Sequence, residues 1–250
     1  MSPVEASGLL IAAGVLAGVV GSGGGITSLV SYPALLAVGI PPLPANVANL
    51  VAAVVMGPGS AFSSRRELAD TRPVLIRLLP LCTLASLLGS ALLLITPPGV
   101  FARVVPLLVA AGSVALVVQP ALMTIRARGA HGVGGPTVLL VGAVSIYSGY
   151  FGAGSGVMFL AVVLFFYDSR IPRANAIKNV LLGVTSLAAA AVFVLAGPVQ
   201  WNAVLPLAGG LLVGSTLGPI IVRHVPPNLV RWTAAACGFV LAVYLWLRAN

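Results

Sequence analysis

The sequence predicts an all-α polytopic membrane protein made of two inverted-topology repeats, each with about five membrane segments. Three observations lead to this fold class. Of the 250 residues, 59% are hydrophobic and only 7% are charged, which is too little charge to cover a soluble surface. Apolar runs of helical length recur along the whole chain, and a series of landmarks in the first half returns in the second.

The duplication is seen first in the glycines. Segments 18–25 and 149–156 carry glycine at the same four relative positions, and Asn49 is later matched by Asn179. Two further landmarks follow in the same order in each half: Leu88-Gly89 with Leu217-Gly218, and Pro97-Pro98 with Pro226-Pro227. We therefore take residues 1–125 as the first membrane repeat and 126–250 as the second, together forming one transport domain.

Each half contains the same series of apolar runs. They lie at 7–20, 28–39, 46–62, 74–95 and 101–120 in the first half, and at 134–150, 156–167, 174–196, 203–222 and 229–247 in the second. A run of about 13–17 residues reaches only about 20–25 Å as a helix, whereas the hydrocarbon layer is about 30 Å thick. The first two segments of each half are therefore expected to be short and Gly-interrupted, as a re-entrant hairpin or two tilted helices.

Loop charge predicts that the halves have opposite orientation. Loop 39–46 has no charge, whereas its counterpart 168–175 contains Arg170 and Arg173. The next loop reverses the contrast, because arginines cluster around 65–77 and are absent from 196–202. Basic residues concentrate in cytoplasmic loops, so matching loops should face opposite sides, as in inverted repeats. We expect a multi-pass protein of the cell inner membrane with both termini outside the cytoplasm; only Arg103 and Arg248 do not fit.

The glycine-rich breaks form the candidate site. Each break leads into a helix expected to begin inside the membrane, near Thr27 or Ser28 and near Val157. The first N–H groups of a helix lack acceptors and its dipole is positive there, which favours an anion. Glycine lets the backbone approach a ligand closely. The alternative is that these glycines permit close helix packing, which Gly14-x-x-x-Gly18 fits.

Polar side chains after the breaks complete this site. Lys178, the only lysine, lies about 10 Å along its helix, where it would attract an anion or reach to the membrane interface. Asn49 and Asn179 would line the path or join two helices by a hydrogen bond. The predicted substrate-binding residues are Ser22, Gly23, Gly24, Gly25, Thr27, Ser28, Tyr32, Asn49, Tyr150, Gly152, Gly154, Ser155, Gly156, Lys178 and Asn179.

Enzymatic functions lack the residues they need. A nucleophile at Ser155 would require a base, but no histidine occurs inside a membrane segment. The chain also lacks the clustered ligands of a metal site and the Gly-Lys-Ser/Thr of a nucleotide loop. We expect no enzyme, cofactor, metal or nucleic acid, with a small anion and membrane lipid as partners. The coupling ion, the direction of transport and the formation of a homodimer stay open.

The glycine-rich hairpins resemble those of the TauE/SafE family of permeases, also called the sulfite exporter or toluene-sulfonate uptake family. The resemblance is carried by 18–25, by Ser31-Tyr32-Pro33-Ala34-Leu35-Leu36 and by 149–156, within a layout covering essentially the whole chain. It implies a secondary transporter of a small sulfur-containing anion, such as sulfite, an organosulfonate or thiosulfate. A channel-like anion pore, or a carrier of another small metabolite or ion, is the alternative. The second half departs from the first-half motif, with Ser155 in place of Gly24 and no proline like Pro33.

Overall fold

The computed structural model describes residues 2–24, 27–56, 68, 71–124, 134–168, 170–221 and 227–249. Within these ranges the chain forms ten α-helices and one 3-10 helix, with no strand, so the all-α prediction is confirmed. The elements are α1 (Pro3–Gly24), α2 (Ser28–Ala37), α3 (Pro42–Ala52), η1 (Ala53–Val55), α5 (Arg72–Ile95), α6 (Pro98–Thr124), α7 (Gly135–Tyr150), α8 (Ser155–Phe166), α9 (Ile171–Ala196), α10 (Trp201–Ile221) and α11 (Pro227–Ala249). The last part of the predicted run 46–62 lies outside the described residues.

Helix α1 corrects one prediction. The apolar run 7–20 indicated a short segment, but the helix extends over 22 residues. It begins earlier because Ser2 and Glu5 cap it reciprocally: the Ser2 N–H donates to Glu5 Oε2 at 2.8 Å, and the Glu5 N–H donates to Ser2 Oγ at 3.3 Å. The other early segments, α2, α7 and α8, are short as predicted, with 10, 16 and 12 residues.

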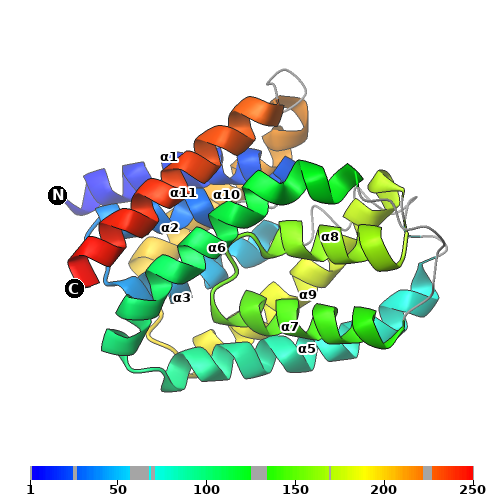
Figure 1. The fold of residues 1–250 in the computed structure, drawn as a ribbon. Coiled ribbons are helices and arrows are strands. Elements are labelled where there is room, and N and C mark those ends of the chain that lie inside the picture. Colours follow the sequence, from blue (N-terminus) through cyan, green and yellow to red (C-terminus); the bar gives the residue numbers. More distant parts are fainter. Residues whose placement is uncertain are drawn as a thin grey trace.

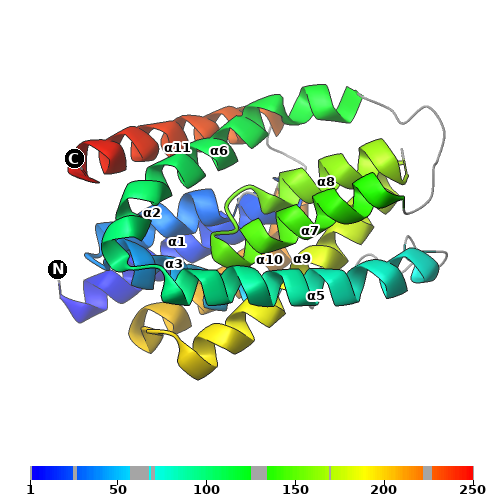
Figure 2. The same cartoon turned by 60° about the horizontal axis from the view of Figure 1, so that its bottom comes forward.

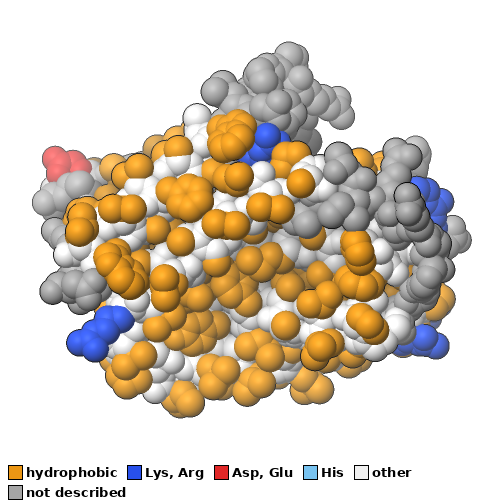
Figure 3. Space-filling view, in the orientation of Figure 1, with side chains coloured by type: hydrophobic (Ala, Val, Ile, Leu, Met, Phe, Trp, Pro, Cys, Tyr) orange, Lys and Arg blue, Asp and Glu red, His pale blue; other side chains and the backbone are white. Residues whose placement is uncertain are grey.

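Five of the described helices are long and apolar enough to cross a membrane. They are α1, α5, α6, α9 and α10. Large hydrophobic side chains are exposed along the outer faces, including Leu195 at 86% and Ile95 at 76% of full exposure. Figure 3 shows hydrophobic side chains covering one face of the molecule, with Lys and Arg near its margins. Such a surface is suited to lipid, and the chain is a multi-pass membrane protein.

The long helices pair across the two halves of the sequence. α1 packs along α10, α5 along α7, and α6 along α11, while α3 and α9 meet in the centre (Figures 1 and 2). α1 begins and α11 ends at the same end of the molecule (Figure 1). The short helices α2, α3 and α8 pack against this set: α2 contacts α1 and α3, and α8 contacts α7 and α9.

Glycines hold two of these pairs in close contact. A Cβ built on Gly14 would lie 2.5 Å from the Leu207 carbonyl oxygen, and one on Gly18 would lie 2.6 Å from that of Leu211. A Cβ on Gly149 would likewise clash with the Ser86 carbonyl of α5. The packing interpretation of Gly14 and Gly18 is therefore confirmed, because only glycine lets these backbones approach so closely.

Candidate functional site

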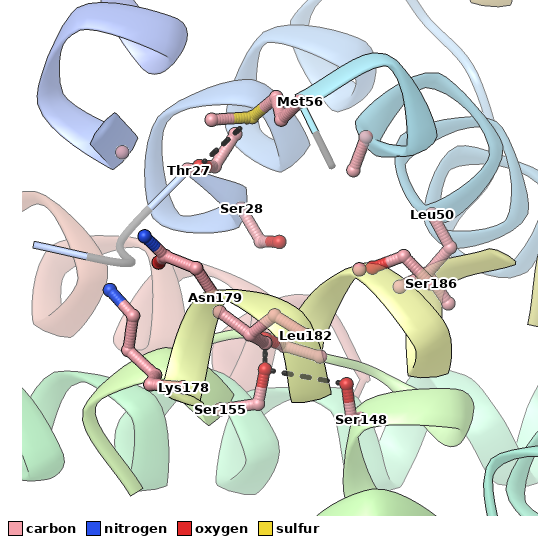
Figure 4. A pocket seen from close by; sticks show the side chains of 14 residues that line it. Thr27, Ser28, Leu50, Met56, Ser148, Ser155, Lys178, Asn179, Leu182 and Ser186 are labelled. Atoms are coloured by element: carbon pink, nitrogen blue, oxygen red, sulfur yellow. Dashed lines mark hydrogen bonds between the residues drawn. The ribbon is translucent and has the colours of Figure 1, made fainter. Parts of the chain in front are cut away.

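A cavity of about 90 Å³ lies where the two hairpin tips meet α9 (Figure 4). One wall comes from the α1–α2 tip, one from the α7–α8 tip and one from a single face of α9, while α3 and η1 close the remaining side. The lining residues are Gly21, Thr27, Ser28, Leu50, Ala53, Met56, Ser148, Gly152, Ser155, Lys178, Asn179, Leu182, Gly183 and Ser186.

The tip of the second hairpin depends on two glycines. Gly152 and Gly154 have φ of +80° and +75°, a backbone conformation that other residues adopt only at a cost. A Cβ on Gly154 would also lie 2.9 Å from the Cα of Gly112 in α6. The chain therefore turns sharply here, and α8 begins at Ser155, two residues before the predicted Val157. α2 begins at Ser28, as predicted.

Lys178 is the charged group of this cavity. Its side chain is 2% exposed and lines the cavity from the third turn of α9. Among the residues that the structure describes, none forms an ion pair or a hydrogen bond with it. Burying an unpaired ammonium group is costly, and inside a membrane such a group normally faces a partner or a water-filled cavity. Within the described residues, nothing offsets a positive charge on Lys178 in this cavity.

The hydroxyl groups around Lys178 differ in their availability. Thr27 Oγ1 donates to Met56 Sδ at 3.5 Å, and Ser155 Oγ donates to the Gly152 carbonyl at 2.8 Å. Ser28 and Ser186, in contrast, form no side-chain hydrogen bond within the described part of the chain. The Ser28 hydroxyl and the Asn179 amide thus leave donors near Lys178 that a bound anion can use, and the Ser186 hydroxyl leaves one farther along α9.

The predicted site residues fall into three groups. Those that line the cavity are Thr27, Ser28, Gly152, Ser155, Lys178 and Asn179. Those that lie away from it are Tyr32, Asn49, Tyr150, Gly154 and Gly156. Gly25 lies outside the described residues, as do the side-chain surroundings of Ser22, Gly23 and Gly24 at the end of α1.

Three of the residues away from the cavity have structural partners. The Tyr32 hydroxyl donates to the Pro42 carbonyl at 3.3 Å, and that of Tyr150 donates to Thr96 Oγ1 at 3.3 Å. Asn49 is 1% exposed and pairs with the Ser31 hydroxyl. The helix–helix hydrogen bond considered for Asn49 is therefore present, between α3 and α2.

Sequence reasoning missed eight lining residues: Gly21, Leu50, Ala53, Met56, Ser148, Leu182, Gly183 and Ser186. For three of them a signal existed. Leu182, Gly183 and Ser186 follow Lys178 at the spacing of one helix face, so the lysine could have located that whole face.

Comparison with known proteins agrees with the fold. The sequence profile "Sulfite exporter TauE/SafE" matches residues 7–245. A "Probable membrane transporter protein" of Haemophilus influenzae is 25% identical, over 95% of this chain and 93% of the relative. "Probable membrane transporter protein ORF9" of a Sinorhizobium species is 27% identical, over 94% and 90%. YfcA of Escherichia coli K12, with the same description, is 24% identical, over 90% and 83%. No solved structure matches the chain. The predicted resemblance is confirmed: the chain belongs to the sulfite exporter TauE/SafE family of membrane transporters.

Proposed function

We propose that this protein is a secondary transporter that moves a small sulfur-containing anion, of the sulfite, organosulfonate or thiosulfate type, across the inner membrane. The observation that carries the proposal is Lys178, which is buried and has no anionic partner among the described residues, yet lines the cavity between the hairpin tips. An anion bound there would supply the missing charge. The family description points to a sulfur oxyanion.

The donors around the cavity support this type of ligand. A sulfite or sulfonate group has three acceptor oxygens, and Lys178, Asn179 and Ser28 each offer N–H or O–H donors. The nearby start of α2 adds the positive end of a helix dipole. A volume of about 90 Å³ admits several water-sized groups but not a large metabolite.

Helix packing supports two inverted repeats as the transport scaffold. In the repeat, α1 would correspond to α7, α5 to α10 and α6 to α11. A symmetry operation that exchanges the two repeats would then convert the contact between α1 and α10 into a contact between α7 and α5. Both contacts are present. The same operation would exchange α6 with α11, so that this pair maps onto itself. α6 and α11 run antiparallel, because Ser113 lies against Gly238 while Ala102 shares a groove with Tyr244. Antiparallel pairing of these two matched helices fits a two-fold axis in the membrane plane, as in inverted repeats, better than one along its normal.

The test is thermal stability of the full chain in detergent against sulfite, thiosulfate, sulfoacetate, taurine, sulfate, phosphate and acetate. An anion at 100 times its dissociation constant should add about 2.7 kcal/mol of apparent stability. We expect a sulfur oxyanion or sulfonate to raise the melting temperature, and Lys178→Gln to abolish that rise. Arg103→Gln is the control, because it removes one positive charge from an exposed position outside the cavity.

Two results would contradict the proposal. One is the absence of stabilisation by any sulfur-containing anion. The other is a Lys178→Gln variant that responds as the wild type does. Transport measurements in proteoliposomes then distinguish a carrier from a channel-like pore: saturable, substrate-specific flux favours the carrier, and conductance well above carrier rates favours the pore.

A further inference from the structure

The cavity is a slot that lies along α9. Lys178 and Ser186 line it eight residues apart, which corresponds to about 12 Å along the helix. In Figure 4, Lys178 and Asn179 lie at one side, and Leu50 lies with Ser186 at the other. An anion that places its charged group at Lys178 therefore directs the rest of the molecule toward Leu50.

Leu50 closes the slot at that end. Its side chain is 4% exposed, and its Cδ2 would lie 2.9 Å from a Cβ built on Gly152. Leu50 thus spans from α3 to the backbone of the second hairpin tip. Ala53 and Met56 follow Leu50 at steps of three residues and line the same side of the cavity, with Met56 next to Thr27 (Figure 4). This part of the wall is apolar.

The structure behind Leu50 is firmly packed. Asn46, one turn earlier on α3, donates from Nδ2 to the Tyr150 carbonyl at 2.8 Å. Phe151, next to Gly152, is 1% exposed and meets the Tyr32 ring edge-on, with ring centroids 5.4 Å apart. A close-packed interior of this kind yields little to a group pressed against it. Leu50 belongs to the same buried core cluster as Tyr32 and Phe151, so the wall that carries it is closely packed.

We infer that Leu50 is the specificity-determining residue that limits the length of the substituent on the bound anion. The anionic group lies at Lys178, and any apolar substituent extends along the slot until it meets Leu50. This inference rests on the proposed function, because it assumes that a small sulfur-containing anion occupies the cavity. It goes further by assigning charge recognition and size selection to different residues on different helices.

The experiment measures binding of linear alkanesulfonates, from methanesulfonate to hexanesulfonate, to the purified full chain in detergent. Each methylene that fits against an apolar wall contributes about 0.8 kcal/mol, or about fourfold in affinity. We expect wild-type affinity to rise by about that factor per carbon and to fall once the chain meets Leu50. Leu50→Ala should move the optimum one or two carbons longer.

Ala53→Val is the converse variant, since it narrows the same wall and should move the optimum shorter. Leu116→Ala is the matched control: it makes the same truncation at a fully buried leucine of α6 that does not line the cavity, and should keep the wild-type optimum. Ala53→Val keeps the test decisive if Leu50→Ala does not fold.

The outcomes separate the two proposals. Sulfonate binding with the same length profile in the wild type and in every folded wall variant overturns the inference and leaves the proposed function standing. Failure of the wild type to bind sulfite, thiosulfate or any sulfonate overturns both. A shift in opposite directions for Leu50→Ala and Ala53→Val supports the assignment.

Discussion

Two neighbouring glycines of α10 provide a sharp test of the helix packing. A Cβ built on Gly210 would lie 2.3 Å from the Ile11 carbonyl oxygen of α1, about 1 Å short of ordinary contact, whereas one built on Gly209 meets nothing within 4 Å. Because alanine has the higher helix propensity, replacing either glycine by alanine should stabilise the helix by about 0.8–1.0 kcal/mol. Only Gly210→Ala also forces α1 and α10 apart, at a cost of about 1–3 kcal/mol.

Because both variants share the propensity gain, the difference between them isolates the packing cost. We expect Gly209→Ala to melt slightly above the wild type and Gly210→Ala to melt below Gly209→Ala, by roughly 2–4 °C for each kcal/mol. The assay is thermal unfolding of the detergent-purified variants, followed by loss of the monodisperse peak in size-exclusion chromatography. If Gly210→Ala melts at or above Gly209→Ala, the close α1–α10 contact is wrong.

Three further predictions follow. Gly154→Ala should lower the melting temperature by an amount equivalent to about 2–4 kcal/mol, from its positive φ and from contact with Gly112; Gly99→Ala, with open space around it, should not. Hydrogen bonds from Arg170 lower the pKa of Asp168. The ionised Asp168 carboxylate therefore stabilises the fold at every pH above the ordinary aspartate pKa of about 3.9. This stabilisation is lost as the pH falls through the lowered pKa of the folded state. Asp168→Asn should therefore weaken the decline in melting temperature below about pH 4; an identical decline contradicts this. Reporters fused at either terminus should be active outside the cytoplasm, and activity of the C-terminal fusion only inside it would refute the inverted topology.

The positions of most helices could be predicted from the lengths of the apolar runs. α5 and α6 agree with the runs 74–95 and 101–120 to within a few residues, because the pair Pro97-Pro98 separates them. α1 was misjudged because hydrophobicity alone does not mark where a helix starts. The Ser2–Glu5 capping pair extends it beyond the apolar run, and that pair was visible in the sequence.

The site could be predicted only in part. Thr27, Ser28 and Lys178 stand out as polar residues in an apolar chain, and they line the cavity. Tyr32 stands out equally but packs against Phe151, since polarity does not reveal which way a side chain faces. Leu50 could not be found, because one leucine among many carries no signal until the fold places it at the cavity.

The two halves contribute unequally to the cavity, and this asymmetry separates the effects of two variants. Lys178 precedes Asn179, whereas the residue before the matching Asn49 is Ala48, which is fully buried. Among the described residues that line the cavity, the second half thus supplies the only charge, and the first half supplies Leu50. Lys178→Gln should therefore lower the binding affinity for every anion by a similar factor. Leu50→Ala should instead change the order of affinities among anions of different length. If Lys178→Gln changes the order of affinities by length but does not lower affinity, then the two halves do not recognise charge and size separately.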